Sequence, residues 1–177
     1  MKQANFVSIT GGIYKGRKVA TPGGKTHPMG ERERLALFNM LTGEISGAVV
    51  LDAFAGSGVI GIEALSRGAS SVTFVDKSTD ATGVIRKNLN SLGTEGDFCV
   101  IRGKMSDVAL KLDDFDVIIA DPPYDDFKLS EIECLVSKLK EGGVLVLSHP
   151  DEAPEIAGLI LDKTRQYARA HISFYHK

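Results

Sequence analysis

The stretch IIADPPYDDF, residues 118–127, places chemically useful groups at the end of a run of β-forming residues. Asp121 supplies a carboxylate and Tyr124 an aromatic ring, and the two prolines between them fix the backbone dihedral φ. A proline also holds the residue before it extended, so Asp121 is expected to end a strand. Such a strand end offers acceptor oxygens and a stacking surface in a rigid arrangement.

These groups suit an exocyclic amino group on a nucleic-acid base. The Asp121 carboxylate and the Pro122 carbonyl can accept its two N–H hydrogens, which favours a pyramidal nitrogen whose lone pair is free to attack. Tyr124 can stack on the base, a contact worth about 1–3 kcal/mol. Positioning and aimed dipoles then favour an in-line displacement. Whether Asp121 takes the proton is left open, and a stiff turn with Asp121 capping the next helix is the simpler alternative.

A second motif, LDAFAGSGVIG, spans residues 51–61 and contains glycines in a G-x-G-x-x-G pattern, at Gly56, Gly58 and Gly61. Glycines in this pattern permit a tight turn and close approach of a ligand between a strand and a helix. Asp76 ends the next predicted strand, 24 residues after Asp52, where a carboxylate can accept both hydroxyls of a ribose. The loop therefore predicts a nucleoside-bearing cofactor, although the pattern alone is a weak signal.

The position of Asp52 helps to choose that cofactor. A pyrophosphate requires the positive end of a helix, and a carboxylate directly before the loop is a poor neighbour for phosphates. The same carboxylate suits an ammonium group. S-adenosylmethionine carries an ammonium and a ribose but no phosphate, so the loop favours S-adenosylmethionine over NAD.

The elements that position these motifs alternate between strand and helix. Short apolar runs predict strands at 48–53, 71–76, 97–101, 115–120 and 143–148. Helical patterns fall near 58–67, 79–92, 104–112, 128–140 and 153–161, and the tail, residues 163–177, has two β-rich stretches typical of an edge hairpin. Alternation of this kind predicts an α/β fold, a parallel sheet with helices on both faces. In the usual doubly wound order, the first and fourth strand ends are neighbours, which brings both motifs together.

The first 47 residues differ from the rest. They predict a basic arm and a helix that pack beside a single sheet domain at 48–177. Residues 1–40 contain seven Lys and Arg against two Glu, whereas the remainder has 14 basic and 21 acidic residues. A basic front on an acidic body suggests contact with a polyanion, although a solvated arm would have the same composition.

Composition is that of one ordinary domain. The chain has 177 residues, 43% hydrophobic and 25% charged, which is enough to bury a core. The N-terminus lacks an apolar signal segment, no apolar run approaches the length of a membrane span, and the two cysteines form no zinc pattern. We therefore expect a cytoplasmic protein with no metal and no membrane contact, and a monomer, although oligomeric state is not encoded in any motif.

The sequence resembles a known family. FAGSG followed by DPPY is similar to the amino-group methyltransferases that use S-adenosylmethionine. The segments ITGGIYKGRKVATP, HPMGERERLALFNML and LDAFAGSGVIGIEALSRGASSVTFVD resemble the bacterial 16S rRNA guanine-N2 methyltransferases over nearly the whole chain. The resemblance implies a Rossmann-like class I fold, a seven-stranded sheet with an antiparallel last strand. It also implies methylation of a guanine N2 in 16S rRNA, within the 30S ribosomal subunit.

The resemblance also implies roles for individual residues. Asp121, Pro122 and Tyr124 would hold the target amine and base. The cofactor would be bound by Asp52, Phe54, Gly56, Gly58, Asp76, Lys104 and Met105. The RNA would be contacted by Lys15, Arg17, Lys18, Arg32 and Arg34.

Two positions depart from the family pattern. The family has Arg-Pro-Thr before its first helix, where this chain has His27-Pro28-Met29. The family also has an acidic or amide residue near the adenine, where this chain has Lys104 after Gly103, so that Ser106 or Asp107 would have to substitute.

Three other functions are alternatives that use parts of these motifs. A DNA adenine-N6 methyltransferase would also use DPPY, but the chain has no room for a separate DNA-reading domain. An NAD-linked oxidoreductase would explain the glycine loop and leave DPPY without a role. An RNA-binding module with an inactive pocket would not need Asp121 and Tyr124.

Overall fold

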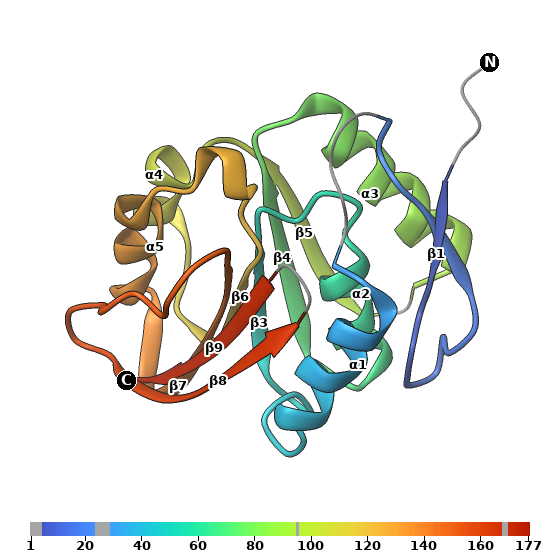
Figure 1. The fold of residues 1–177 in the computed structure, drawn as a ribbon. Helices are drawn as coiled ribbons and strands as arrows, with labels where there is room; N and C mark the ends of the chain where they lie inside the picture. Colours follow the sequence, from blue (N-terminus) through green and yellow to red (C-terminus); the bar gives the residue numbers. More distant parts are fainter. Residues whose placement is uncertain (1–4, 24–28, 95, 168–169) are drawn as a thin grey trace.

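A seven-stranded sheet forms the centre of the protein (Figure 1). The computed structural model describes residues 5–23, 29–94, 96–167 and 170–177. The strand order is β5-β4-β3-β6-β7-β9-β8. Five strands are parallel to one another, namely β3 (Val49–Ala53), β4 (Ser71–Asp76), β5 (Asp97–Arg102), β6 (Phe115–Ala120) and β7 (Leu139–His149). The tail supplies β8 (Ile160–Tyr167) and β9 (Ala170–His176), and β9 is antiparallel to both of its neighbours.

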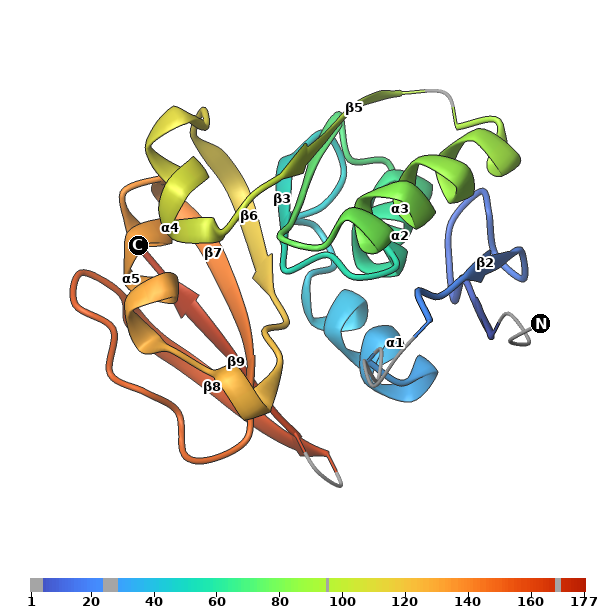
Figure 2. The ribbon, with the colours of Figure 1, turned by 90° about the horizontal axis from the view of Figure 1, so that it is seen from above.

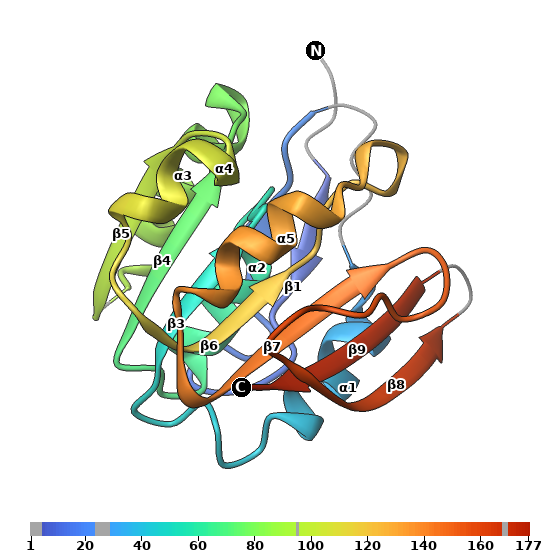
Figure 3. The ribbon, with the colours of Figure 1, turned by 90° about the vertical axis from the view of Figure 1, so that its left-hand side faces the viewer.

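Helices cover both faces of this sheet (Figures 2 and 3). On one face lie α1 (Glu31–Met40), α2 (Val59–Ser66) and α3 (Thr79–Leu92), and on the other lie α4 (Met105–Val108) and α5 (Leu129–Val136). Successive strand residues alternate between the two cores: Val117 and Ile119 pack with the first group, whereas Ile118 and Ala120 pack with the second. The predicted α/β class, with an antiparallel last strand, is therefore confirmed.

The N-terminal segment packs on the face that carries α1, α2 and α3. It forms a two-stranded antiparallel hairpin, β1 (Phe6–Ser8) and β2 (Lys18–Ala20), ahead of α1. Ile9, Tyr14 and Val19 of this segment are buried in the same core as the helices. The described part of the arm thus has no core of its own and depends on the sheet domain for its burial.

Three predicted helices differ from the structure. The helix expected at 104–112 consists of α4 and then η1 (Ala109–Lys111), a short 3₁₀ helix with a tighter turn. The helix expected at 128–140 ends at Val136, because β7 already begins at Leu139. The helix expected at 153–161 is absent: no residue from 151 to 159 is helical, and β8 starts at Ile160.

The composition of that last segment explains its irregular path. Pro154 lacks a backbone N–H, and Gly158 adopts φ +84°, a left-handed conformation that ends a helix rather than continuing it. The carbonyl of Pro154 instead accepts a hydrogen bond of 2.8 Å from the Tyr175 hydroxyl.

A second 3₁₀ turn, η2 (Tyr124–Asp126), follows β6. Across the described residues, no helix combines the length and apolar character needed to cross a membrane.

Candidate active site

The ends of β3 and β6 lie side by side at one edge of the sheet. The two strands are parallel neighbours with Ala53 opposite Ala120, and the Asp121 N–H approaches the Ala53 carbonyl at 3.4 Å. Phe54 and Asp121 are therefore the first residues beyond two paired strand ends. The predicted adjacency of the glycine loop and DPPY is confirmed, at the edge where open α/β sheets bind ligands.

The glycine loop turns sharply between β3 and α2. Phe54 has φ +62°, and it is the only non-glycine residue with a positive φ in the part of the chain that the structure describes. Gly56 and Gly58 also have positive φ, and Gly58 is the N-cap of α2. A bulky residue in the left-handed region is uncommon and tends to mark a functional loop.

Gly61 is required for helix packing rather than for the turn of the loop. A Cβ at Gly61 would lie 2.3 Å from Cε1 of Phe74, a buried residue of β4, so this glycine allows α2 to pack closely on the sheet. A Cβ at Gly56, by contrast, would meet nothing closer than the Phe54 carbonyl at 4.0 Å. Gly56 therefore faces open space, in which a ligand can approach the backbone.

Two carboxylates hold this loop in shape. Asp52 Oδ2 accepts a hydrogen bond of 2.8 Å from the N–H of Gly61, in the first turn of α2. Asp76 Oδ2 accepts one of 2.8 Å from the N–H of Gly56, and its Oδ1 accepts another from the N–H of Ser78. Asp52 and Asp76, two of the predicted cofactor ligands, therefore also stabilise the conformation of the loop.

The electrostatics of this edge suit a cation. Burial raises the pKa of Asp52 well above its ordinary value, although the Gly61 N–H opposes the rise. The three carboxylates belong to the ends of the neighbouring strands β4, β3 and β6, and the negative charges of Asp121 and Asp76 raise the Asp52 pKa further. Carboxylates that raise one another's pKa are stabilised by a nearby cation, so this strand end favours a positively charged ligand over a pyrophosphate.

Asp121 and Tyr124 lie next to this group. Burial raises the pKa of Asp121 to about 6, while the nearby Ser148 hydroxyl and the charge of Arg34 oppose the rise. Burial also raises the pKa of Tyr124, whose hydroxyl lies 2.6 Å from Ser148 Oγ. Pro122 is buried, whereas Asp121 and Tyr124 are half-buried. Ser148, at the end of β7, was not predicted, because a lone serine after an apolar strand carries no sequence signal.

Lys104 and Met105 follow the end of β5. Gly103 donates a backbone hydrogen bond of 3.0 Å to the Asp76 carbonyl, which keeps this turn beside the β4 end. Lys104 is exposed at the N-cap of α4, and Met105 is buried in the core on that face. Ser106 Oγ donates to Asp107 Oδ1 at 3.2 Å, and both side chains are exposed.

Four of the five basic residues predicted to contact RNA are exposed, and the fifth is buried. Lys15, Arg17, Lys18 and Arg32 are exposed, and Arg17 donates to the Ser91 carbonyl. Arg34 is fully buried, so its predicted contact with RNA is wrong for this structure. His27 and Pro28 lie outside the described residues.

Arg34 is buried because it forms an ion pair inside the protein. Its Nε donates to Glu63 Oε2 of α2 at 2.9 Å, and its guanidinium also donates to the carbonyls of Ser8 and Met29. The second Glu63 oxygen accepts from the backbone N–H of Thr10 at 2.7 Å. Sequence periodicity cannot reveal this pair, because its partners lie 29 residues apart on separate helices.

Asn88 of α3 forms a second connection between the arm and the sheet domain. Its Nδ2 donates to the carbonyls of Ala20 and Ser57, and its Oδ1 accepts from the Ala20 N–H, all within 3.0 Å. Asn88 is 3% exposed, so these hydrogen bonds lie inside the protein. One side chain therefore connects β2 of the arm to the glycine loop.

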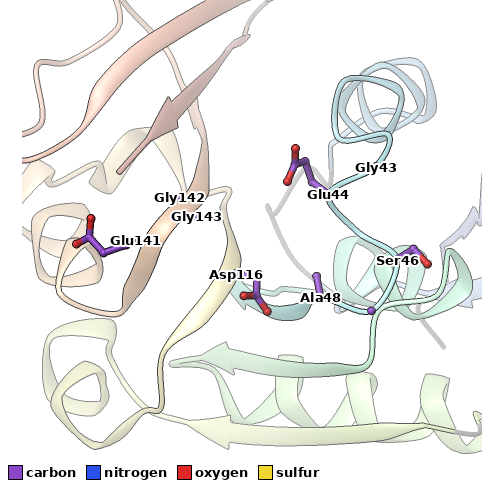
Figure 4. A pocket seen from close by; sticks show the side chains of 9 residues that line it. Gly43, Glu44, Ser46, Ala48, Asp116, Glu141, Gly142 and Gly143 are labelled. Atoms are coloured by element: carbon purple, nitrogen blue, oxygen red, sulfur yellow. The ribbon is translucent and has the colours of Figure 1, made fainter.

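A hollow of about 320 Å³ lies at the opposite edge of the sheet (Figure 4). Ala48 and Asp116, near the starts of β3 and β6, contribute to its lining, together with residues 43, 44, 46 and 47 ahead of β3 and residues 141–143 of β7. It contains none of the predicted site residues. Asp116 is already bound to Lys140 Nζ and to the Val49 N–H, each at 2.8 Å.

Comparisons with known proteins agree with this geometry. Residues 7–176 match the family described as "Conserved hypothetical protein 95". The Haemophilus influenzae protein named "Ribosomal RNA small subunit methyltransferase D" is 33% identical over 85% of this chain and 82% of its own length. The Escherichia coli protein of the same name is 34% identical over 78% of this chain and 69% of its own. A Bacillus subtilis relative is 33% identical over 96% of this chain and 98% of its own.

Solved structures show the same fold. An Escherichia coli structure titled "Putative methyltransferase yhhF" has a TM-score of 0.86 and 30% identity and covers 98% of both chains. A Thermus thermophilus protein has a TM-score of 0.80 and 26% identity over 97% of this chain and 99% of its own. With the match at 7–176, the chain belongs to the "Conserved hypothetical protein 95" family, which includes the ribosomal RNA small subunit methyltransferase D proteins.

Proposed function

We propose that this protein transfers a methyl group from S-adenosylmethionine to the exocyclic N2 amine of a guanine in 16S rRNA, within the 30S ribosomal subunit. The observation that carries the proposal is the pairing of Ala53 with Ala120, which puts the glycine loop and DPPY at one sheet edge. Residues 48–177 act as the methyltransferase domain and residues 1–47 as its RNA-contacting arm. The protein acts in the cytoplasm as a monomer.

The cofactor would be held by residues around the glycine loop. Gly56 and Gly58 provide close backbone approach, and Asp52 and Asp121 are carboxyl groups whose ionised forms a bound cation would stabilise. Asp76 would hold the ribose hydroxyls through lone pairs that its bonds to Gly56 and Ser78 leave free. Phe54, Lys104 and Met105 would complete the site. When bound, S-adenosylmethionine supplies a methyl carbon on a sulfonium sulfur, which keeps the bonding electron pair as the methyl leaves.

The target amine would be oriented by DPPY. Asp121 and the Pro122 carbonyl would accept its N–H hydrogens, and Tyr124 would stack on the guanine ring. With its pKa near 6, the Asp121 carboxyl is ionised at neutral pH and is an acceptor rather than a donor. The methylated nitrogen must lose one proton, and an ionised Asp121 can receive it. These residues mainly supply position and electrostatic stabilisation.

The RNA assignment rests on the arm and on the relatives. The exposed basic residues Lys15, Arg17, Lys18 and Arg32 can neutralise phosphates. The Haemophilus and Escherichia relatives are both named as small-subunit rRNA methyltransferases. A stacked guanine cannot present its amine to a cleft, so we expect the base to leave its stack.

The decisive experiment is mass mapping of 16S rRNA from cells with and without this protein. We expect one guanine to lose an N2 methyl group in its absence. Methylation assays on 30S particles, naked 16S rRNA and duplex DNA then define the substrate. Transfer to duplex DNA alone would replace the proposal with a DNA adenine-N6 methyltransferase.

Variants and ligand binding test the mechanism separately. Asp121→Ala should lose turnover and still bind S-adenosylhomocysteine in calorimetry. Full turnover by this variant on a verified substrate would exclude the proposed role of the carboxylate. Binding of NADH without S-adenosylhomocysteine would instead favour the oxidoreductase.

A further inference from the structure

The 3₁₀ turn η2, which contains Tyr124, is attached to strand ends on both of its sides. Toward β7, the Tyr124 hydroxyl lies 2.6 Å from Ser148 Oγ. Toward β4, Asp126 Oδ2 accepts a hydrogen bond of 3.1 Å from Nζ of Lys77, the first residue after that strand. The cofactor and substrate roles described above use neither Lys77 nor Asp126.

The ion pair between Lys77 and Asp126 joins two loops whose strands are not neighbours in the sheet. In the strand order, β3 lies between β4 and β6. Two strand spacings amount to about 10 Å, which a lysine and an aspartate side chain can span together. The contact therefore extends across the end of β3, where Phe54 begins the glycine loop.

Each end of this contact lies beside a residue with a role in the proposed reaction. Lys77 directly follows Asp76, which would hold the cofactor ribose. Asp126 is two residues from Tyr124, which would stack on the guanine. Because the two loops are tied together, a shift of the loop after β4 moves the turn, and a shift of the turn moves the loop.

We propose that Lys77 is a positioning residue for methyl transfer, which couples occupancy of the cofactor site to the conformation of the turn that carries Tyr124. The inference rests on the proposed function for its catalytic consequence. A cofactor bound at Asp76 orders the loop after β4, and Lys77 transmits that order to the turn through Asp126. The target base then meets an ordered Tyr124 when the methyl donor is in place.

A surface ion pair without this role makes a different prediction. The Lys77 and Asp126 side chains are 60% and 48% exposed, and exposed pairs add little to stability because water and salt screen them. Variants of Lys77 should therefore fold normally. An ordinary surface pair would leave the response of the turn to the cofactor unchanged.

The chain offers a matched control in Lys128. Its Nζ lies 3.0 Å from Asp126 Oδ1, and its side chain is 59% exposed, close to the values for Lys77. Lys128 lies between the turn and α5, so its contact with Asp126 is local and reaches no second strand end. Replacement of either lysine by methionine removes one cation from the same carboxylate, but only the Lys77 change breaks the connection across β3.

The first test follows the backbone N–H of Asp126, which donates to the Pro123 carbonyl at 3.1 Å and exchanges with water when the turn opens. Its hydrogen exchange is measured by NMR in the wild type, Lys77→Met and Lys128→Met, with and without S-adenosylhomocysteine. We expect the ligand to slow exchange by about 5-fold or more in the wild type and in Lys128→Met. In Lys77→Met, the ligand should bind without slowing it.

Other results overturn the inference. Equal slowing in Lys77→Met and Lys128→Met would show that the ion pair carries no coupling. Loss of S-adenosylhomocysteine binding in Lys77→Met would make Lys77 a cofactor ligand instead. Asp126→Asn, which alters the other partner of the contact, should behave like Lys77→Met, and a wild-type response would contradict the inference.

The second test is kinetic and uses the substrate identified by mass mapping. Lys77→Met should lower kcat by roughly 3- to 10-fold and change the KM for S-adenosylmethionine by less than about 2-fold, because it disturbs the position of Tyr124 rather than cofactor binding. Lys77→Arg, which keeps the cation, should recover most of the activity. A raised KM with an unchanged kcat would overturn the inference.

The two tests separate this inference from the proposed function. A wild-type protein that binds S-adenosylhomocysteine but methylates no guanine N2 refutes the proposed function, while the exchange of the Asp126 amide still decides the role of Lys77. Conversely, normal rRNA methylation together with equal exchange in the two lysine variants refutes only the role of Lys77.

Discussion

Arg34 and Glu63 form an ion pair of 2.9 Å in which neither side chain is exposed to solvent. The pair connects α1 to α2, the helix that follows the glycine loop, and Ser8 and Thr10 of the arm bond to it. A residue that looked like part of an RNA-binding surface is therefore part of the joint between the arm and the sheet domain.

Breaking this pair should destabilise the protein strongly. Arg34→Met leaves the Glu63 carboxylate buried without its cation, and we expect the free energy of unfolding to fall by about 3–5 kcal/mol in urea titrations. Arg32→Ala, an exposed change two residues away, should stay within about 0.5 kcal/mol of the wild type. Equal stability of the two variants would contradict the buried pair.

The exposed arginine of α1 should matter for RNA instead. Arg32→Ala is expected to weaken binding to rRNA fragments of any sequence and to reduce the slope of log K against log salt by about 0.7–1, the value for one phosphate contact. Lys140→Ala, beside the hollow at the opposite sheet edge, serves as the control and should leave the slope unchanged. A wild-type slope for Arg32→Ala would exclude direct phosphate contact.

Asp121 should make the stability of the protein depend on pH. Because its pKa rises to about 6 on folding, the folded state binds this proton more tightly than the unfolded chain. The ionised Asp121 carboxyl therefore lowers the free energy of unfolding. This loss of stability is absent below about pH 4, where the carboxyl is protonated in both states, and complete above about pH 6. Asp121→Asn should therefore raise the free energy of unfolding by roughly 1–3 kcal/mol at pH 8 and by little at pH 4. The exposed change Asp125→Asn should give no gain at either pH.

Two glycines should respond to alanine in opposite ways. Gly61→Ala places a methyl group 2.3 Å from Phe74 and should lower the free energy of unfolding by about 1–3 kcal/mol. Gly83, within α3, has open space at the place that an alanine methyl group would occupy, so Gly83→Ala should raise stability by about 0.5–1 kcal/mol. Thermal unfolding followed by circular dichroism measures both, and a stable Gly61→Ala protein would disprove the close packing of α2 on β4.

Asn88 should control the attachment of the arm. Asn88→Ala removes the bonds to Ala20 and Ser57, so we expect limited proteolysis to cut residues 5–23 faster. Affinity for S-adenosylhomocysteine should also fall, because Ser57 belongs to the glycine loop. Asn90→Ala, on the exposed side of the same helix, is the control. Identical cleavage rates in the two variants would show that the Asn88 hydrogen bonds do not hold the arm in place.

The sequence alone determined the fold class and the central motifs. Alternating apolar runs gave four of the strand positions to within about a residue, since buried parallel strands need continuous apolar side chains. Glycines and prolines also act locally through their allowed φ values, so the turns after β3 and β6 were predictable. The predicted helix at 153–161 was wrong, because Pro154 and Gly158 interrupt a pattern that is apolar only on average.

Only the tertiary structure decided what the polar side chains do. Arg34, Glu63, Asn88 and Ser148 look like ordinary surface or strand-end residues in the sequence. Each is 3% exposed or less and bonds to a residue at least 20 positions away. Burial and hydrogen bonding of this kind depend on which distant segments the sheet order brings together, and no local pattern records that. The candidate site residues are therefore recognisable in short motifs, whereas the buried contacts that hold them in position form only in the folded protein.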